Sequence, residues 1–162
     1  MEPLDLLLDL LAAEGERITM LVSAASEQDL AQVRAYPNSM HGSDAWLMTL
    51  EQARYEHPRN IHSATKLLAT ALVGQISLDE TVAQLASRPA EQFAIPDRGS
   101  LAPGSFADIV IVDPDRADRY LRTTAERTSY PEIVRWVFVN GVAVIENGVH
   151  NGRTPGRVLR AQ

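Results

Sequence analysis

The sequence has no cysteine, a single lysine and no long apolar run. Without cysteine there are no disulfides, thiolate zinc ligands or cysteine nucleophiles, which suits a reducing compartment. Arginines are scattered around the lone Lys66, so the basic cluster typical of nucleic-acid binding is missing. No stretch approaches the roughly 20 apolar residues that span a membrane, and the acidic N-terminus lacks the basic leader of a signal peptide. We expect a soluble, cytoplasmic chain without nucleic-acid or membrane partners.

The first 44 residues show alternating helix and strand patterns. Leucines on most sides of 3–14 predict a buried helix, and the apolar run at 17–25 predicts a strand covered on both faces. Ser26 is a typical cap for a short helix that ends before Pro37, and 39–43 reads as a second strand. Such alternation is typical of units built around a parallel sheet.

Helical patterns continue to about residue 96 and then give way to strand patterns. Ser63, Ser77 and Pro89 are each expected near a helix start, and Ser77 with Glu80 has the spacing of a capping box. Beyond this point "IVIVD" predicts a strand, and Asn140-Gly141 predicts a tight hairpin. We therefore expect two parts, 1–96 and 97–162.

Several motifs resemble those of known enzymes. The segments "RPAEQFAIPDRGSLAPGSFADIVIVD" and "VFVNGVAVIENG" resemble the C-terminal tail of the amidohydrolase superfamily. "PLDLLLDLL", "GSDA" followed by "HPR", and "GRTPGRVLR" resemble the N-acyl-D-amino-acid deacylases (D-aminoacylases) more closely. The resemblance implies an α/β fold: 1–96 as the C-terminal part of a metal-dependent β/α (TIM-like) barrel, and 97–162 as strands of a small β-sandwich with the C-terminal tail.

Two residues carry the function that this resemblance implies. Asp44, in "GSDA", matches the family's aspartate that binds at the zinc ion and acts as the general base, so the resemblance implies both a metal-binding and a catalytic role for it. Arg59, in "HPR", matches the arginine that holds the substrate's α-carboxylate. Taken without the resemblance, the sequence favours Asp44 as a turn former or helix cap. The alternative role of Arg59 is that of a surface loop arginine.

The four histidines are not expected to bind metal. His41 is three residues from Asp44, so on a strand the two side chains point to opposite faces; a packed or hydrogen-bonded role is favoured. His57 is expected to fix its loop. His62 and His150 have no metal-ligand spacing with other residues.

The resemblance implies a fragment of a zinc-dependent amidohydrolase that cleaves the linear amide of N-acyl-D-amino acids. The family's His-x-His pair is absent, so this chain is expected to be inactive alone. A cyclic-amide hydrolase and a non-catalytic interaction module are the alternatives. Because an incomplete barrel leaves open strand edges, we expect a homodimer or association with the missing N-terminal part.

Overall fold

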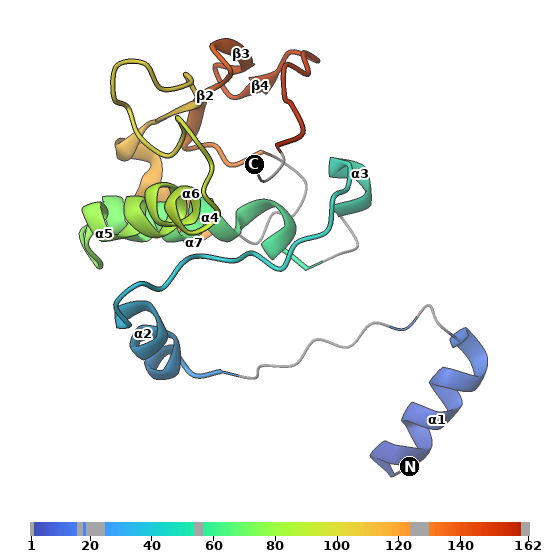
Figure 1. Cartoon of the computed structure of the whole chain (residues 1–162). Helices are drawn as coiled ribbons and strands as arrows, with labels where there is room; N and C mark the ends of the chain where they lie inside the picture. The colour runs from blue at the N-terminus through green and yellow to red at the C-terminus, as the bar shows by residue number, and fades with distance from the viewer. Residues whose placement is uncertain (1, 16–17, 19–24, 54–56, 124–129, 160–162) are drawn as a thin grey trace. The chain divides into compact units, whose positions relative to one another are not determined.

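The computed structural model describes residues 2–15, 18, 25–53, 57–123 and 130–159 (Figure 1). Contacts divide the chain into two units, Met1–Pro37 and Asn38–Gln162. The strand predicted at 17–25 falls on residues 17 and 19–24, so it lies outside the described residues. No helix in the described ranges is long and apolar enough to cross a membrane.

The first unit contains two helices, α1 (Pro3–Glu14) and α2 (Glu27–Ala35). Pro3 lies in the first turn of α1, and Gly15 ends it with a φ of 57°. A reciprocal capping box starts α2: Ser26 Oγ accepts from the backbone N–H of Asp29, and the Asp29 carboxylate accepts from the backbone N–H of Ser26. The Ser26 side-chain and backbone hydrogen bonds lower the pKa of Asp29. Both helices lie where the sequence predicts them.

The leucines of α1 contradict the prediction of a buried helix. No described residue of α1 is buried. The exposed fractions of its leucine side chains lie between 43% and 64% for Leu4, Leu6, Leu7, Leu8, Leu10 and Leu11. Apolar side chains on several faces of a helix can be covered only by several neighbours, which the described residues of this unit do not supply.

The second unit begins with a helical layer. Its helices are α3 (Leu50–Ala53), α4 (Arg59–Leu72), α5 (Leu78–Val82), the π-helical turn η2 (Ala83–Ser87) and α6 (Arg88–Gln92). The capping box predicted at Ser77 is confirmed in part: Ser77 Oγ accepts from the backbone N–H of Glu80 and caps α5. The Glu80 carboxylate accepts instead from Arg88 and Gln84. The start predicted at Ser63 is wrong. Helix α4 begins four residues earlier, at Arg59, where His57 Nδ1 accepts from the backbone N–H of Arg59 at 3.1 Å.

A small antiparallel sheet follows, with strand order β1-β2-β3-β4. Its strands are β1 (Ile109–Val112), β2 (Val134–Val139), β3 (Val142–Glu146) and β4 (Val149–His150). Asn140 and Gly141 join β2 to β3 with φ angles of 50° and 79°, the left-handed pair that a two-residue hairpin needs. The predicted hairpin and the strand at "IVIVD" are confirmed.

The core of this unit lies where α4, α7 (Ala117–Thr123) and the start of β2 meet. Helix α7 follows the short 3-10 helix η3 (Pro114–Arg116) and packs against α4 (Figure 1). The sequence did not predict α7. The buried cluster is Ala69, Ala117, Tyr120, Ile133 and Val134. The members of this cluster come from both sides of position 97. The division into two parts at that position stays a prediction.

The barrel strand predicted at 39–43 is wrong. Residues 39–49 have no regular secondary structure. A parallel strand needs a hydrogen-bonding neighbour, and the predicted neighbour lies outside the described residues. Within them, the backbone N–H of His41 donates instead to the carbonyl of Gln84 in η2 at 3.1 Å. The described chain is thus a mixed α/β structure whose sheet is small and antiparallel.

Replacing Tyr120 by phenylalanine is expected to lower the free energy of unfolding by about 2 kcal/mol. Its hydroxyl lies 2.8 Å from both Thr65 Oγ1 and His62 Nδ1, and the residue is 3% exposed. Burial raises the pKa of Tyr120 above the ordinary 10.0. The contribution of the neutral phenol to stability is therefore fully present below the ordinary pKa of 10.0. It is lost as the pH rises through the raised pKa of the folded state.

Urea denaturation at pH 7 and across pH 9–12 would measure this effect. Tyr36→Phe is the control, because Tyr36 is 70% exposed and surface substitutions usually change stability by less than about 0.5 kcal/mol. Equal losses in Tyr120→Phe and Tyr36→Phe would show that the hydrogen bonds between α7 and α4 do not stabilise the fold.

Candidate functional site

The candidate site is the segment 39–46, whose later part lies against the first turns of α4. It carries Asp44, the residue that the sequence singled out as a base. Three side-chain contacts hold this part to α4: His41 Nε2 to Ser63 Oγ at 2.9 Å, Asp44 Oδ2 to an Arg59 terminal nitrogen at 3.0 Å, and the backbone N–H of Trp46 to Asn60 Oδ1 at 2.9 Å. The structure therefore brings Asp44 and Arg59 together.

The backbone of Asp44 is left-handed, with a φ of 51°. Aspartate tolerates this region better than most residues, and Ser43 Oγ supports the turn by accepting from the backbone N–H of Ala45 at 3.3 Å. The Asp44 side chain is 84% exposed, while that of Arg59 is 41% exposed. An ion pair this exposed contributes roughly 0–1 kcal/mol. A competing carboxylate could replace Asp44 at little cost.

A second set of contacts fixes the beginning of the segment to η2 and to the first residue of α6. Gln84 Nε2 donates to Ser39 Oγ at 2.9 Å, and Arg88 donates to the Ser39 carbonyl at 3.3 Å. Arg88 also forms a two-pronged pair with Glu80, with distances of 2.5 and 2.8 Å. The Arg88 hydrogen bond lowers the pKa of Glu80, against a smaller opposing effect of burial.

Sequence reasoning missed this support for the segment. Glu80, Gln84 and Arg88 are four residues apart, a spacing that places them on one helical face. That spacing was visible in the sequence, but it did not indicate that Ser39 is the partner.

Two of the roles predicted for the histidines are confirmed. His41 is hydrogen-bonded, and His57 fixes its loop by accepting from the Arg59 backbone. His62 is 4% exposed and bonded to Tyr120 in the core. His150 Nδ1 accepts from the backbone N–H of Gly152. Among the residues that the structure describes, no group of three or more His, Asp or Glu side chains could hold a metal ion.

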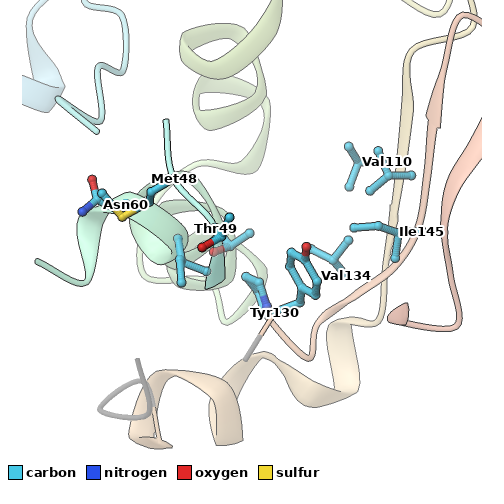
Figure 2. A pocket seen from close by; sticks show the side chains of 11 residues that line it. Met48, Thr49, Asn60, Val110, Tyr130, Val134 and Ile145 are labelled. Carbon is cyan, nitrogen blue, oxygen red and sulfur yellow. The ribbon is translucent and has the colours of Figure 1, made fainter. Parts of the chain in front are cut away.

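A pocket of about 400 Å³ lies between the α4 side of the unit and the sheet (Figure 2). Asn60, Met48 and Thr49 lie on the helical side, and Val110 and Ile145 lie on the strands. The other lining residues are Ile61, Thr65, Tyr130, Pro131, Val134 and Val137. The described lining residues carry no carboxylate or imidazole, so they offer apolar contacts and hydrogen bonds rather than acid–base chemistry.

No protein-family model matches the chain. It is 31% identical over 145 residues to an N-acyl-D-glutamate deacylase of Alcaligenes xylosoxydans xylosoxydans, covering 85% of this chain and 27% of the relative. A solved D-aminoacylase mutant in complex with copper chloride superposes with a TM-score of 0.70 at 29% identity, covering 84% of this chain and 28% of that one.

A solved N-acyl-D-glutamate deacylase from Bordetella bronchiseptica is also similar, with a TM-score of 0.67, 36% identity, and coverage of 84% of this chain and 28% of that one. That enzyme was solved with zinc and a phosphonate that mimics the tetrahedral intermediate. A D-hydantoinase of Ralstonia pickettii is 30% identical over 139 residues, covering 78% of this chain and 26% of the relative. The chain spans about a quarter of the length of the relatives that it matches.

Proposed function

This chain is a homologue of the N-acyl-D-amino-acid deacylases, metal-binding hydrolases of the amidohydrolase superfamily, and we propose that it forms the C-terminal part of such an enzyme. The reaction is hydrolysis of the linear amide of an N-acyl-D-amino acid. The observation that carries the proposal is the contact between Asp44 and Arg59 at 3.0 Å. It joins a potential base to a potential carboxylate-binding group.

Asp44 is the general base in this proposal. Its exposed carboxylate takes a proton from the water that attacks the amide carbonyl carbon. It returns this proton to the nitrogen as the C–N bond breaks, leaving a carboxylic acid and a free amine. Arg59 binds the α-carboxylate of the substrate through its forked N–H groups. Because the Asp44–Arg59 pair is largely exposed, the substrate's α-carboxylate can replace Asp44 as the partner of Arg59 without a large energetic penalty.

The described residues do not by themselves fit a zinc site. Such a site needs three or four protein ligands, and among the described residues no group of three or more His, Asp or Glu side chains could hold a metal ion. In this proposal Asp44 supplies one ligand. Support for a metal comes from the solved neighbours, one of which contains zinc. We propose that the intact enzyme binds zinc through further ligands outside the described residues.

Cyclic-amide hydrolysis is the second candidate, and the similarity to D-hydantoinase favours it. The two activities differ at Arg59, because an N-acyl amino acid carries a free carboxylate and a hydantoin ring does not. The two activities can be compared in a chimaera, in which residues 3–159 replace the matching segment of the Bordetella bronchiseptica deacylase. The isolated 162-residue chain is the negative control. It is expected to be inactive, because its described residues contain no group that could hold a metal ion.

In this chimaera, Arg59→Ala is expected to raise KM for N-acyl-D-amino acids about tenfold to a hundredfold, with little change in kcat. One charge-assisted hydrogen-bonding group contributes about 1.5–3 kcal/mol. It acts on a carboxylate that is charged in both the ground and transition states, so its effect falls on binding. Steady-state kinetics with zinc present, on N-acyl-D-amino acids and on hydantoins, measure this.

Arg122→Ala is the control, because Arg122 is a 70% exposed surface arginine paired with Asp118. The control should leave both KM and kcat unchanged. A fall in kcat alone for Arg59→Ala would contradict the carboxylate-binding role. Turnover of hydantoins but not of N-acyl-D-amino acids would favour the second candidate. Activity on neither substrate in a folded, metal-loaded chimaera would favour a non-catalytic module.

We also propose that the exposed leucines of α1 are covered by a second copy of the chain or by the rest of the enzyme. Exposed apolar surface of this kind drives association. The isolated chain is expected to elute as a dimer rather than a 17.8 kDa monomer, and Leu4→Gln combined with Leu8→Gln is expected to shift it toward monomer. Size-exclusion chromatography with light scattering measures this. A stable, compact monomer would show that the chain covers these leucines itself.

A further inference from the structure

We propose that Gln84 and Asn60 are positioning residues for the Asp44 carboxylate, and that they act through the backbone of the segment 39–46. The inference rests on the proposed function, because it takes Asp44 as the reactive group. Neither residue contacts Asp44 through a hydrogen bond that the structure records. Each holds the chain on one side of it.

Gln84 holds the upstream side. It is 5% exposed, and its amide nitrogen donates to Ser39 Oγ at 2.9 Å and to Glu80 Oε1 at 3.1 Å. Its backbone carbonyl accepts from the N–H of His41 at 3.1 Å. Gln84 lies within the π-helical turn η2. Such turns interrupt the regular helical hydrogen bonds and recur at functional sites. Here a carbonyl of the π turn accepts a hydrogen bond from the segment that carries Asp44.

Asn60 holds the downstream side. Its Oδ1 accepts from the backbone N–H of Trp46 at 2.9 Å. Asn60 is the second residue of α4, directly after Arg59, which pairs with Asp44. The first turn of one helix therefore supplies both the proposed carboxylate-binding group and the anchor that sets where Asp44 lies beside it.

The spacing of the two anchors explains why both are needed. The Gln84 side chain fixes Ser39 and the Asn60 side chain fixes Trp46. Only residues 40–45 separate these two anchored residues, and each residue spans at most about 3.6 Å. With both ends fixed, this stretch has little freedom to move. With either end released, Gly42 allows the backbone conformations that other residues disfavour. The left-handed φ of 51° at Asp44 is then no longer imposed, and the carboxylate loses its fixed position.

The first test uses the full 162-residue chain and the fluorescence of Trp46. Trp136→Phe leaves Trp46 as the only tryptophan. Gln84→Leu and Asn60→Leu in this background are each expected to increase the amplitude of fast motion in time-resolved anisotropy. Tyr120→Phe is the control, because it weakens the core between α4 and α7 without touching the segment. Its anisotropy should match the parent. Unchanged anisotropy in both leucine variants overturns the proposal.

The second test measures kinetics in the chimaera. Misplacing a catalytic group by about 1 Å can reduce the rate about a hundredfold, so Gln84→Leu and Asn60→Leu are expected to lower kcat by about that factor, with KM nearly unchanged. Asn60→Asp keeps an oxygen acceptor for the Trp46 N–H and should retain most of kcat. A role confined to stability would instead make Tyr120→Phe as harmful as either leucine variant.

The outcomes separate this inference from the function on which it rests. Loss of turnover in Asp44→Asn, together with normal kcat in both leucine variants, overturns the positioning role alone. An Asn60→Asp variant as impaired as Asn60→Leu also overturns it. Full turnover in Asp44→Asn overturns the proposed function itself.

Discussion

Asp44→Asn in the chimaera is expected to lower kcat for N-acyl-D-amino acids by about 10³-fold, in the range that general acid–base catalysis contributes. Asparagine has nearly the same shape and also tolerates a left-handed backbone, so the turn at 44 should persist. The asparagine side chain cannot accept a proton at neutral pH. The lost ion pair with Arg59 was largely exposed, so stability should change by less than about 1 kcal/mol. Steady-state kinetics and thermal unfolding on the same samples measure both effects.

Asp97→Asn is a matched control for this variant. Asp97 is also an exposed aspartate with a left-handed backbone, at a φ of 57°. If Asp44 were only a turn former, both variants would behave alike, with turnover near that of the parent. Zinc content measured on each sample separates proton transfer from metal binding. Turnover lost with metal retained supports the base, whereas metal lost with turnover would make Asp44 chiefly a ligand.

Features set by neighbouring residues were predictable from the sequence. The helix caps at Ser26 and Ser77 each act over three residues, and the turn at Asn140-Gly141 depends on two left-handed residues. Each interaction lies within a few positions of the residue that reveals it. Asp44 and Arg59 were found in another way, through motifs that resemble those of a known family, and neither spacing nor periodicity indicated that they would touch.

Features set by distant residues were not predictable in this way. The bond from Gln84 to Ser39 spans 45 positions, and that from Tyr120 to His62 spans 58. The segment 39–43 was expected to be a strand in the helix–strand alternation, but a strand exists only where a neighbour pairs with it. Helix α7 was hidden by its charges, because its few buried positions, Ala117 and Tyr120, gave too little apolar pattern to recognise.

Gly99→Ala is expected to have the largest effect on stability, lowering the free energy of unfolding by about 3 kcal/mol. Gly99 has a φ of 79°, and a Cβ there would lie 2.6 Å from Ala90 Cβ and 2.9 Å from the Ala86 carbonyl oxygen. Alanine therefore meets two penalties. The left-handed backbone costs about 1–2 kcal/mol, and the overlap forces the loop away from η2 and α6, as overpacking does in other cores.

Gly104→Ala separates these two penalties. Gly104 also has a left-handed backbone, with a φ of 96°, but a Cβ there would meet no atom within 4 Å. It should lose only the backbone contribution, about 1–2 kcal/mol, in the same urea titration. The additional loss in Gly99→Ala measures how tightly the loop packs on η2. Because Ala86 belongs to the turn that also contains Gln84, Gly99→Ala should loosen the segment 39–46 and increase the local motion of Trp46. Equal losses in the two alanine variants would mean that η2 can shift freely, and that it is too compliant to position Asp44.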